Sequence, residues 1–209
     1  QIIDKDSAAE IIKIFTEVII APGITDEAKE IFESKSNLRI LILPTLHEKS
    51  RSQNYKSIEG GILVQTNDSE ETIKSDLKIV TQNKPSDHQI EDMLFAFKVC
   101  KHVKSNAIIY VKNKKTIGIG AGQMSRVDSA KIASQKNSEM DPSDENSLKD
   151  SVVASDAFFP FADGLLVTIE SGAKAVIQPG GSVKDEEVIA AADEAGISMV
   201  FTGKRHFKH

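Results

Sequence analysis

The stretch TIGIGAGQMSRVDSAKIA, Thr116 to Ala133, carries the pattern that decides the fold class. A short apolar run with three glycines (Gly118, Gly120 and Gly122) passes through a polar turn into apolar residues at helical spacing. This order predicts a buried strand that leads directly into a helix. Because ligands of open α/β sheets bind beyond the carboxyl ends of strands, the turn is a candidate binding position.

Strands and helices alternate in the same way around this stretch. Short apolar runs bounded by turn residues predict strands at 106–112, 116–122, 152–159, 174–180 and 198–203. Apolar residues at helical spacing predict helices at 86–103, 125–135, 162–171 and 183–195. Ser86 and Gln89 have the spacing of a capping box at the start of the first of these helices. Short links between alternating elements predict an α/β protein with a mixed sheet covered by helices.

The first 84 residues show an incomplete version of this pattern. They predict helices at 8–18 and 25–32, with Thr25 as the N-cap of the second, and strands at 18–21, 38–43, 60–66 and 77–81. The strand at 38–43 has the composition of a buried strand, and residues 44–58 give no clear prediction. We therefore predict a boundary near residue 84, between residues 1–84 and a compact unit of residues 85–209. Within that unit the polar segment 134–150 predicts an exposed, mobile loop.

Composition argues against several functional classes. The 209 residues are 40% apolar and carry a net charge of −5, which is ordinary for a globular protein and argues against a broad nucleic-acid surface. No apolar run approaches the roughly 20 residues that span a bilayer, so no membrane segment is predicted. The single cysteine fits a reducing compartment, and the five scattered histidines show no zinc spacing. The opening QIIDKDSAAE lacks an initiator Met, so we interpret the chain as a piece of a longer polypeptide.

Two of the predicted strand ends carry side chains suited to binding. After the first, Arg126 offers a rigid fork of donors for phosphate or carboxylate, while Ser125 is suited to cap the helix. After the second, SDAFFPFADG places three phenylalanines in four positions, either as a core plug or as a wall for a flat aromatic ligand. Asp163 beyond them can cap a helix or accept hydrogen bonds from an amino-substituted heterocycle.

The third strand end and the final segment each allow two interpretations. IQPGGS at 177–182 is either a plain turn or a loop whose backbone N–H groups point outward to a ligand. TGKRHFKH at 202–209 is either a frayed tail or a segment that folds Arg205 and His206 back over a site. The glycine run does not match G-x-G-x-x-G and no acidic residue follows at the required spacing, which argues against a dinucleotide. Its glycines can also permit the close approach of another segment.

These motifs together resemble one family. The stretches SNAIIYVKNKKTIGIGAGQMSRVDSAKIA, VVASDAFFPFADG, IQPGGSVKDEEVIAAADEAGI and TGKRHF are similar, in this order, to the C-terminal part of the bifunctional purine-biosynthesis enzyme AICAR transformylase/IMP cyclohydrolase. The resemblance runs from IIAPG at 19–23 through GGILVQ at 60–65 to the last residue. The segment 134–150 departs from the family by being longer and more polar.

The resemblance implies an activity, a fold and an assembly. It implies transfer of a formyl group from 10-formyltetrahydrofolate, the co-substrate, to the 5-amino group of AICAR, giving FAICAR, which a partner domain closes to IMP. It implies two cytidine-deaminase-like three-layer α/β units without a metal, the second complete at 85–209 and the first partial at 1–84. It also implies a cytoplasmic homodimer whose active sites are shared between chains, with no nucleic-acid or membrane partner.

Individual binding residues carry over by their positions in these motifs. The resemblance implies that the AICAR contacts in this chain are Asn106, Arg126, Phe158 and Arg205. It implies that the folate contacts are Val127, Asp163, Ser182 and Val183.

The catalytic group of the family is expected upstream of this chain. In the family it is a histidine that follows a lysine in a K-H-x-x-P-x-G type motif. Lys101-His102 is followed by VKSNAI, with neither proline nor glycine, and aligns with the end of a helix, so we assign His102 no catalytic role. The upstream arginine and tyrosine of the AICAR site and the cyclohydrolase domain are also missing. The sequence therefore predicts part of a formyltransferase site, with little turnover by itself.

Two other functions remain open from the sequence. The chain can be a non-catalytic ligand-binding or dimerisation module of the same fold, or a dinucleotide-dependent oxidoreductase. A reading frame that continues upstream into the K-H-x-x-P-x-G motif would favour the enzyme over the module.

Overall fold

The chain forms two compact units. The computed structural model describes residues 1–45, 53–140, 142 and 147–208. Unit 1 comprises Gln1–Ser69 and unit 2 comprises Glu70–His209. The sequence predicted a boundary near residue 84, but residues 70–84 pack with unit 2, because β5 (Lys78–Ile79) pairs with the last strand of that unit. The correspondence of the units to subdomains of the transformylase stays a prediction.

Unit 1 begins with two helix–strand pairs. They are α1 (Lys5–Ile11) with β1 (Val18–Ala21) and α2 (Asp26–Phe32) with β2 (Arg39–Ile42), and the two strands are parallel. Thr25 caps α2 as predicted, because its side chain accepts a hydrogen bond from the backbone N–H of Ala28. The core of this part is small and consists of Ala8, Ile19, Ala21, Ala28 and Phe32.

The predicted burial of the strand at 38–43 is wrong. Leu41 and Ile42 of β2 are 51% and 48% exposed. The helices cover only the face of the β1–β2 sheet that carries Ile19, Ala21 and Ile40, so Leu41 on the other face is uncovered within the unit. Ile42 lies on the same face as Ile40 and is exposed at the end of β2. An apolar run at the centre of a sheet and one on a half-covered sheet have the same composition, so the sequence could not separate them.

A β-hairpin completes unit 1. β3 (Gln53–Ile58) pairs antiparallel with β4 (Gly61–Thr66), and Gly60 takes a positive φ of 78° in the turn between them. The strand predicted at 60–66 is confirmed, whereas β3 lies in the segment 44–58, for which there is no clear prediction. Residues 46–52 of that segment lie outside the described residues.

Unit 2 is an α/β fold with a mixed sheet, as predicted. The six strands of the sheet follow the order β5-β10-β9-β8-β6-β7. After β5 and the short 3-10 helix η1 (Lys74–Asp76) before it, the elements are α3 (Asp87–Cys100), β6 (Ile108–Lys112), β7 (Lys115–Gly120), α4 (Arg126–Met140), β8 (Ser151–Ser155), α5 (Ala162–Glu170), β9 (Ala173–Gln178), α6 (Asp185–Glu194) and β10 (Ser198–Phe201). The capping box of Ser86 and Gln89 at the start of α3 is confirmed by hydrogen bonds in both directions.

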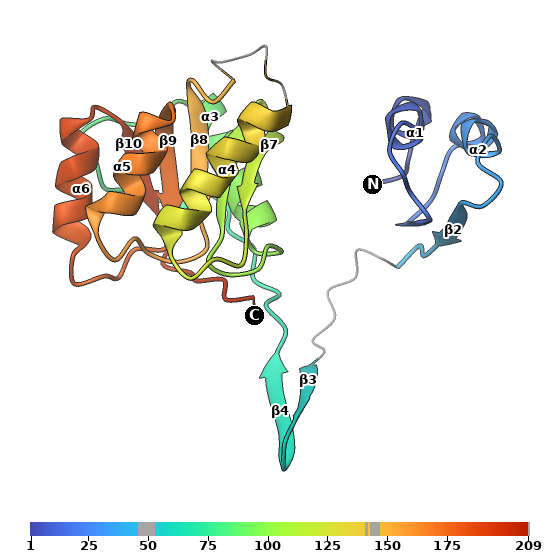
Figure 1. Ribbon diagram of the computed structural model, residues 1–209, viewed down its shortest axis with the longest axis horizontal. Coiled ribbons are helices and arrows are strands. Elements are labelled where there is room, and N and C mark those ends of the chain that lie inside the picture. Colours follow the sequence, from blue (N-terminus) through green and yellow to red (C-terminus); the bar gives the residue numbers. More distant parts are fainter. Residues whose placement is uncertain (46–52, 141, 143–146, 209) are drawn as a thin grey trace. The chain divides into compact units, whose positions relative to one another are not determined.

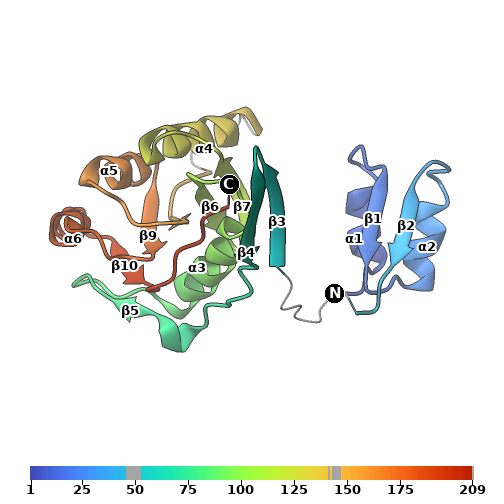
Figure 2. The ribbon, with the colours of Figure 1, turned by 90° about the horizontal axis from the view of Figure 1, so that it is seen from below.

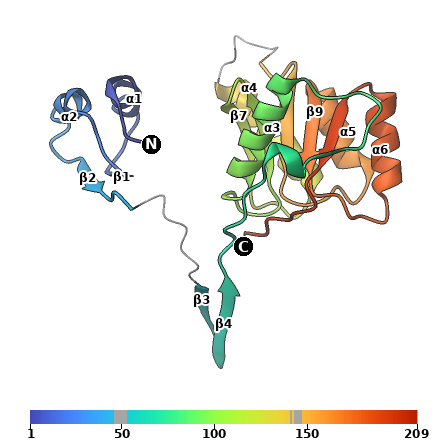
Figure 3. The same cartoon turned by 180° about the vertical axis from the view of Figure 1, so that it is seen from behind.

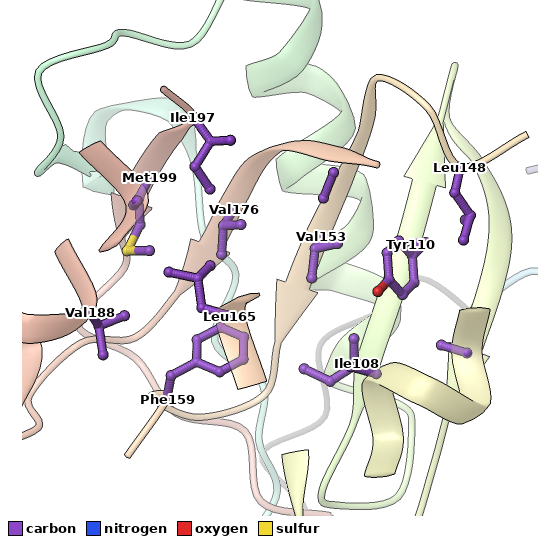
Figure 4. Close-up of a cluster of buried hydrophobic side chains, with 14 residues drawn as sticks. Ile108, Tyr110, Leu148, Val153, Phe159, Leu165, Val176, Val188, Ile197 and Met199 are labelled. Carbon is purple, nitrogen blue, oxygen red and sulfur yellow. The ribbon is translucent and has the colours of Figure 1, made fainter. Parts of the chain in front are cut away.

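The helices of unit 2 lie on both faces of the sheet. Helices α4, α5 and α6 cover one face, and α3 covers the other (Figures 1 and 3). Alternate strand residues divide between two apolar clusters, because successive side chains of a strand point to opposite faces. Ile108, Tyr110 and Val153 pack under α4 and α5, in the cluster shown in Figure 4. Ile109 and Val152 pack against α3.

Five strand ends lie at one edge of this sheet. β8, β9 and β10 run parallel to one another, and β7 runs in the same direction because both β7 and β8 are antiparallel to β6. The carboxyl ends of these four strands and the start of β6 therefore lie at one edge, which we call the carboxyl edge. Figure 2 shows the ribbon of Figure 1 from below, which is the side of unit 2 on which the C-terminus lies. None of the described helices has the length and apolar character required to cross a membrane.

The glycines of β7 serve helix packing. A Cβ at Gly120 would overlap the backbone of Ser129, and one at Gly118 the backbone of Ala133, so α4 rests directly on the strand. The interpretation of a close backbone approach is thus confirmed for these two glycines. Helix α4 continues to Met140, so the loop predicted at 134–150 is wrong for residues 134–140. Residues 141 and 143–146 lie outside the described residues.

Candidate functional site

The carboxyl edge brings together the residues that the sequence singled out. Each follows a strand of the sheet or precedes β6, and three of them lie in the first turns of helices that begin there. Asn106 precedes β6, Arg126 and Val127 follow β7, Phe158 and Asp163 follow β8, Ser182 and Val183 follow β9, and Arg205 follows β10. The topology thus gathers at one edge residues that are up to a hundred positions apart in the chain.

Arg126 is held in place by two acceptors from the end of β8. Its Nε donates to Oγ of Ser155 over 3.1 Å, and its Nη2 donates to Oδ1 of Asp156 over 3.0 Å. The side chain is 12% exposed, so the guanidinium lies just inside the surface. Ser125 caps α4 as anticipated, because its Oγ accepts from the backbone N–H of Asp128 over 3.0 Å. Arg126 therefore presents a fixed, nearly buried group of donors at the carboxyl edge.

Asp156 is a functional candidate that the sequence did not indicate. Its side chain is fully buried, and its second oxygen accepts a hydrogen bond from Oγ of Ser105. Burial raises the pKa of Asp156, and the Arg126 guanidinium beside it opposes that rise. Its partners lie 51 and 30 positions earlier in the chain, so no local pattern could reveal them.

Asn106 is anchored against the turn that follows β7. Its backbone N–H and its Nδ2 both donate to the carbonyl oxygen of Gln123, over 3.2 and 2.9 Å. Its own carbonyl accepts from Oγ of Ser129 over 2.7 Å. The peptide bond between Ser105 and Asn106 is cis. These bonds join the start of β6 to the turn before α4, so that Asn106 and Arg126 belong to one hydrogen-bonded region.

The C-terminal segment folds back across the carboxyl edge. The backbone N–H of Thr202 donates to the carbonyl of Gln178, and that of His206 donates to the carbonyl of Asp156, over 3.0 and 2.9 Å. The Lys208 carbonyl accepts from the backbone N–H of Ser105 over 2.9 Å. The segment therefore runs from the end of β10 past β9 and β8 to β6. Of the two interpretations of TGKRHFKH, the fold-back is confirmed.

The fold-back places Arg205 at the surface beside the buried residues of the edge. Its guanidinium carbon lies 5.2 Å from the ring centroid of Phe207, within the range of a cation–π contact. The neighbouring His206 is buried, with its ring 4.8 Å from that of Phe97 on α3. Alternate residues of the segment thus point outward and inward, and Arg205 is on the outward side.

The three phenylalanines after β8 have different surroundings. Phe159 is fully buried, and its backbone N–H donates to Oε1 of Gln178 over 3.0 Å, so it is the core plug. Phe158 is half-buried, whereas Phe161 is 53% exposed. Asp163 is exposed, and its Oδ1 accepts from the backbone N–H of Gly164 over 2.7 Å. The loop therefore combines a structural anchor with an accessible aromatic surface.

The glycine loop after β9 is closed by its own helix. The side chain of Asp185 accepts from the backbone N–H groups of Gly181 and Ser182, over 2.6 and 3.1 Å. Oγ of Ser182 accepts from the backbone N–H of Lys184. These N–H groups are thus satisfied internally, which favours the plain turn over an anion site. Val183 is fully exposed, at 100%, and offers an uncovered apolar side chain at the edge.

Comparison with known proteins identifies the family. The family model described as "AICARFT/IMPCHase bienzyme" matches residues 1–136. This chain belongs to that family. Curated relatives named "Bifunctional purine biosynthesis protein PurH" from Rhodospirillum rubrum and Parvibaculum lavamentivorans are each 57% identical to it over 99% of the chain. A protein of the same name from Bartonella henselae is 57% identical over 100% of the chain. The chain spans 39–40% of the length of these relatives.

Unit 2 has a cavity that is lined by none of the proposed AICAR and folate contacts. It measures about 410 Å³ and lies between α3, the segment 70–72 and the buried side of the C-terminal segment. Its lining residues are Glu70, Glu71, Thr72, Leu94, Phe95, Phe97, Lys98, Lys101, His102 and His206. None of the eight residues that carry over from the family is among them. Within the described residues, no group of three or more His, Cys, Asp or Glu is placed to hold a metal ion.

Proposed function

We propose that this chain forms part of a formyltransferase that transfers a formyl group from 10-formyltetrahydrofolate to AICAR, giving FAICAR on the route to IMP. The observation that carries this proposal is the convergence of Asn106, Arg126, Phe158 and Arg205 at the carboxyl edge. Family membership assigns the chain to the bienzyme, and the geometry gives these four residues a common surface. The names of the relatives, which refer to purine biosynthesis, agree with this activity.

The four residues supply complementary chemistry for a ribonucleotide with a polar five-membered ring. Arg126 and Arg205 offer N–H donors, which suit phosphate and carboxamide oxygens. Asn106 offers an amide anchored to the turn before α4, and Phe158 offers a ring face for an aromatic heterocycle. By holding the amine in one orientation, these groups lower the entropic part of the barrier to formyl transfer.

The remaining carried-over residues fit the folate co-substrate. Val183 is fully exposed and provides apolar contact for a flat ring, and Val127 lies in the first turn of α4, next to Arg126. Asp163 is an exposed carboxylate, which can accept hydrogen bonds from an amino-substituted pterin. Ser182 lies beside Val183 in the same turn. When bound, the folate supplies the formyl group, and these side chains orient it toward the amine.

Proton transfer requires a group that this chain does not provide. The attacking amine must lose a proton, and a general base must lie within hydrogen-bond reach. The K-H-x-x-P-x-G motif that carries the base in the family is not in this sequence, and His102 is an exposed residue just past α3. We therefore infer that the chain binds and orients both substrates and depends on other residues for turnover.

The assembly and fold assignment form part of the same proposal. Unit 2, with three helices on one face of a mixed sheet and one on the other, is consistent with a complete cytidine-deaminase-like unit, and residues 1–69 of unit 1 would contribute to a partial one. The exposure of Asp163, Val183 and Arg205 at the carboxyl edge is consistent with a site that a second copy of the chain completes in a cytoplasmic homodimer.

Calorimetric titration with AICAR, and separately with a folate analogue, tests the proposal. We expect saturable binding of AICAR that weakens by roughly tenfold in Arg205→Ala and in Phe158→Ala, since one good contact is commonly worth about 1.4 kcal/mol. Lys136→Ala is the matched control for Arg205→Ala, because Lys136 is an exposed cation on the outer surface of α4. Absence of saturable AICAR binding, or equal weakening by the control, would count against the proposed site.

A further inference from the structure

Asp156 connects the three chain segments that carry the proposed AICAR contacts on either side of β8. Its two carboxylate oxygens accept from Nη2 of Arg126 and from Oγ of Ser105. Its carbonyl accepts from the backbone N–H of His206 over 2.9 Å, and its own N–H donates to the carbonyl of Ala107 over 3.4 Å. One buried residue thus joins the start of α4, the start of β6 and the C-terminal segment.

Each of these bonds reaches a proposed AICAR contact or its immediate neighbour. Arg126 is bound directly, Ser105 precedes Asn106, and His206 follows Arg205. Phe158 lies two positions after Asp156 in the same loop. The side chain of Asp156 is itself fully buried, so it does not face a ligand at the surface.

Holding the Arg126 side chain in place before AICAR binds reduces the conformational entropy lost on binding. An arginine side chain loses considerable rotamer freedom when it binds a ligand, and this loss weakens affinity. The contacts at Ser155 and Asp156 fix two nitrogens of the guanidinium, Nε and Nη2, so that most of the loss occurs on folding. The remaining N–H donors then keep one direction at the carboxyl edge.

We propose that Asp156 is a positioning residue, which holds Arg126 and the segments of Asn106 and Arg205 in their binding arrangement without touching AICAR. This inference rests on the proposed function, because it assigns Asp156 a role in the same site. It makes two measurable statements. The guanidinium of Arg126 is immobilised by Asp156 in the absence of ligand, and AICAR affinity depends on that immobilisation.

The first statement is tested by nuclear magnetic resonance on this chain without ligand. With ¹⁵N-labelled arginine, and with the signal assigned by Arg126→Lys, we expect a slowly exchanging Nε–H resonance from Arg126. Asp156→Asn keeps the shape of the side chain and removes its charge, and we expect this resonance to shift and to exchange with water at least about tenfold faster. An unchanged Arg126 resonance in Asp156→Asn overturns the proposal, whatever the outcome with AICAR.

The second statement is tested by AICAR calorimetry with a matched control. Asp156→Asn should weaken AICAR binding by roughly tenfold, which is within the range of coupling energies for contacting groups. Asp92→Asn is the control, since Asp92 is also buried in unit 2 but accepts hydrogen bonds at the β6–β7 turn, at the opposite edge of the sheet. Equal loss of affinity in both variants would show a general effect of instability and would overturn the proposal.

A milder variant keeps the test decisive if Asp156→Asn does not fold. Ser155→Ala removes the acceptor of Nε and leaves Asp156 in place. We expect faster exchange of the Arg126 Nε–H and AICAR binding weaker by about threefold, as for the loss of one modest hydrogen bond. Because Asp156 still binds Nη2 in this variant, exchange of the Arg126 Nε–H as fast as that of the exposed Arg205 would show that Asp156 does not hold the guanidinium and would overturn the proposal. Failure of wild-type protein to bind AICAR would reject the proposed function instead, and the resonance alone would then decide whether Asp156 positions Arg126.

Discussion

The two edges of the six-stranded sheet are each held by a buried aspartate, but the two residues have different partners. At the turn edge, Asp92 of α3 accepts from the backbone N–H groups of Asn113 and Lys114, over 2.9 and 2.7 Å. At the carboxyl edge, Asp156 accepts from the side chains of Arg126 and Ser105. Asp92 therefore stabilises backbone, whereas Asp156 orients side chains.

The difference shows how one residue type serves a backbone turn at one edge and the side chains of the proposed site at the other. Asn113 and Lys114 both take positive φ, 55° and 56°, in the tight turn between β6 and β7, and a buried carboxylate satisfies the N–H groups of that turn. Asp156 instead forms its hydrogen bonds at the carboxyl edge, where five strand ends meet. Burial raises the pKa of Asp156, so the fold holds its ionised form at a cost in free energy. A buried group retained at such a cost is typical of functional sites.

The largest effect is expected from Gly120→Ala at the carboxyl edge. A Cβ there overlaps the backbone of Ser129, so α4 must move away from β7 and carry Arg126 with it. We expect the free energy of unfolding of unit 2 to fall by about 3 kcal/mol, at the upper end of overpacking effects. Urea denaturation measures this change. A loss below about 0.5 kcal/mol, the range of surface substitutions, would show that the contact between α4 and β7 is not tight.

An intermediate effect is expected from Asp92→Ala at the turn edge. Loss of both carboxylate oxygens leaves the N–H groups of Asn113 and Lys114 without their acceptor, at a cost of about 2 kcal/mol in the free energy of unfolding. Because the turn lies away from Arg126, AICAR affinity should not change. Denaturation and calorimetry on the same preparation separate the two properties, and reduced AICAR affinity in a folded Asp92→Ala protein would contradict the division between the edges.

The smallest effect is expected in the pH dependence of Asp156, because the attraction of Arg126 partly cancels the effect of burial. A carboxyl group whose pKa is raised by folding binds more protons in the native state than in the unfolded state. Its stabilising contribution is therefore fully present below the unfolded pKa of 3.8 and is lost as the pH rises through the higher folded pKa. The free energy of unfolding of wild type minus that of Asp156→Asn should accordingly decrease across this window.

Denaturation of both proteins between about pH 4 and 8 measures this difference, and the other carboxyl groups cancel in the subtraction. A difference that increases with pH would show that Arg126 stabilises the carboxylate by more than burial destabilises it.

Some features of unit 2 could be predicted from the sequence and others could not. The alternation of strands and helices in unit 2 was predictable because each element has a local period and local caps, as at Ser86 and Gln89. The glycines of β7 indicated a close approach, and the structure identifies α4 as the approaching segment. The extension of α4 to Met140 was missed because most of its last residues are polar and exposed, and the buried one among them is Asn137, so they carry no apolar period.

The sequence indicated the proposed site only through residues whose chemistry stands out at strand ends, and their role in binding stays a proposal. Arg126, Phe158 and Arg205 have side chains whose chemistry stands out at strand ends, and their family motifs agree. Asp156 was missed because its significance depends on partners 30 and 51 positions away and on complete burial, neither of which has a local signature. An acidic residue directly after an apolar run, as in VVASD, is the one signal that could have drawn attention to it.

The C-terminal segment has a consequence for how the protein is made. Its contacts with Asp156 and Ser105 join residues 206 and 208 to positions synthesised much earlier, and β10 must first pair with β9. Contacts of such wide sequence separation form late in folding, because the entropy of closing a long loop is lost before they form. During synthesis on the ribosome, the helices of unit 2 and its β6–β7 hairpin can pack together before the C-terminal segment lies across the carboxyl edge. Binding at the proposed site should therefore become possible only after residues 202–208 have left the exit tunnel.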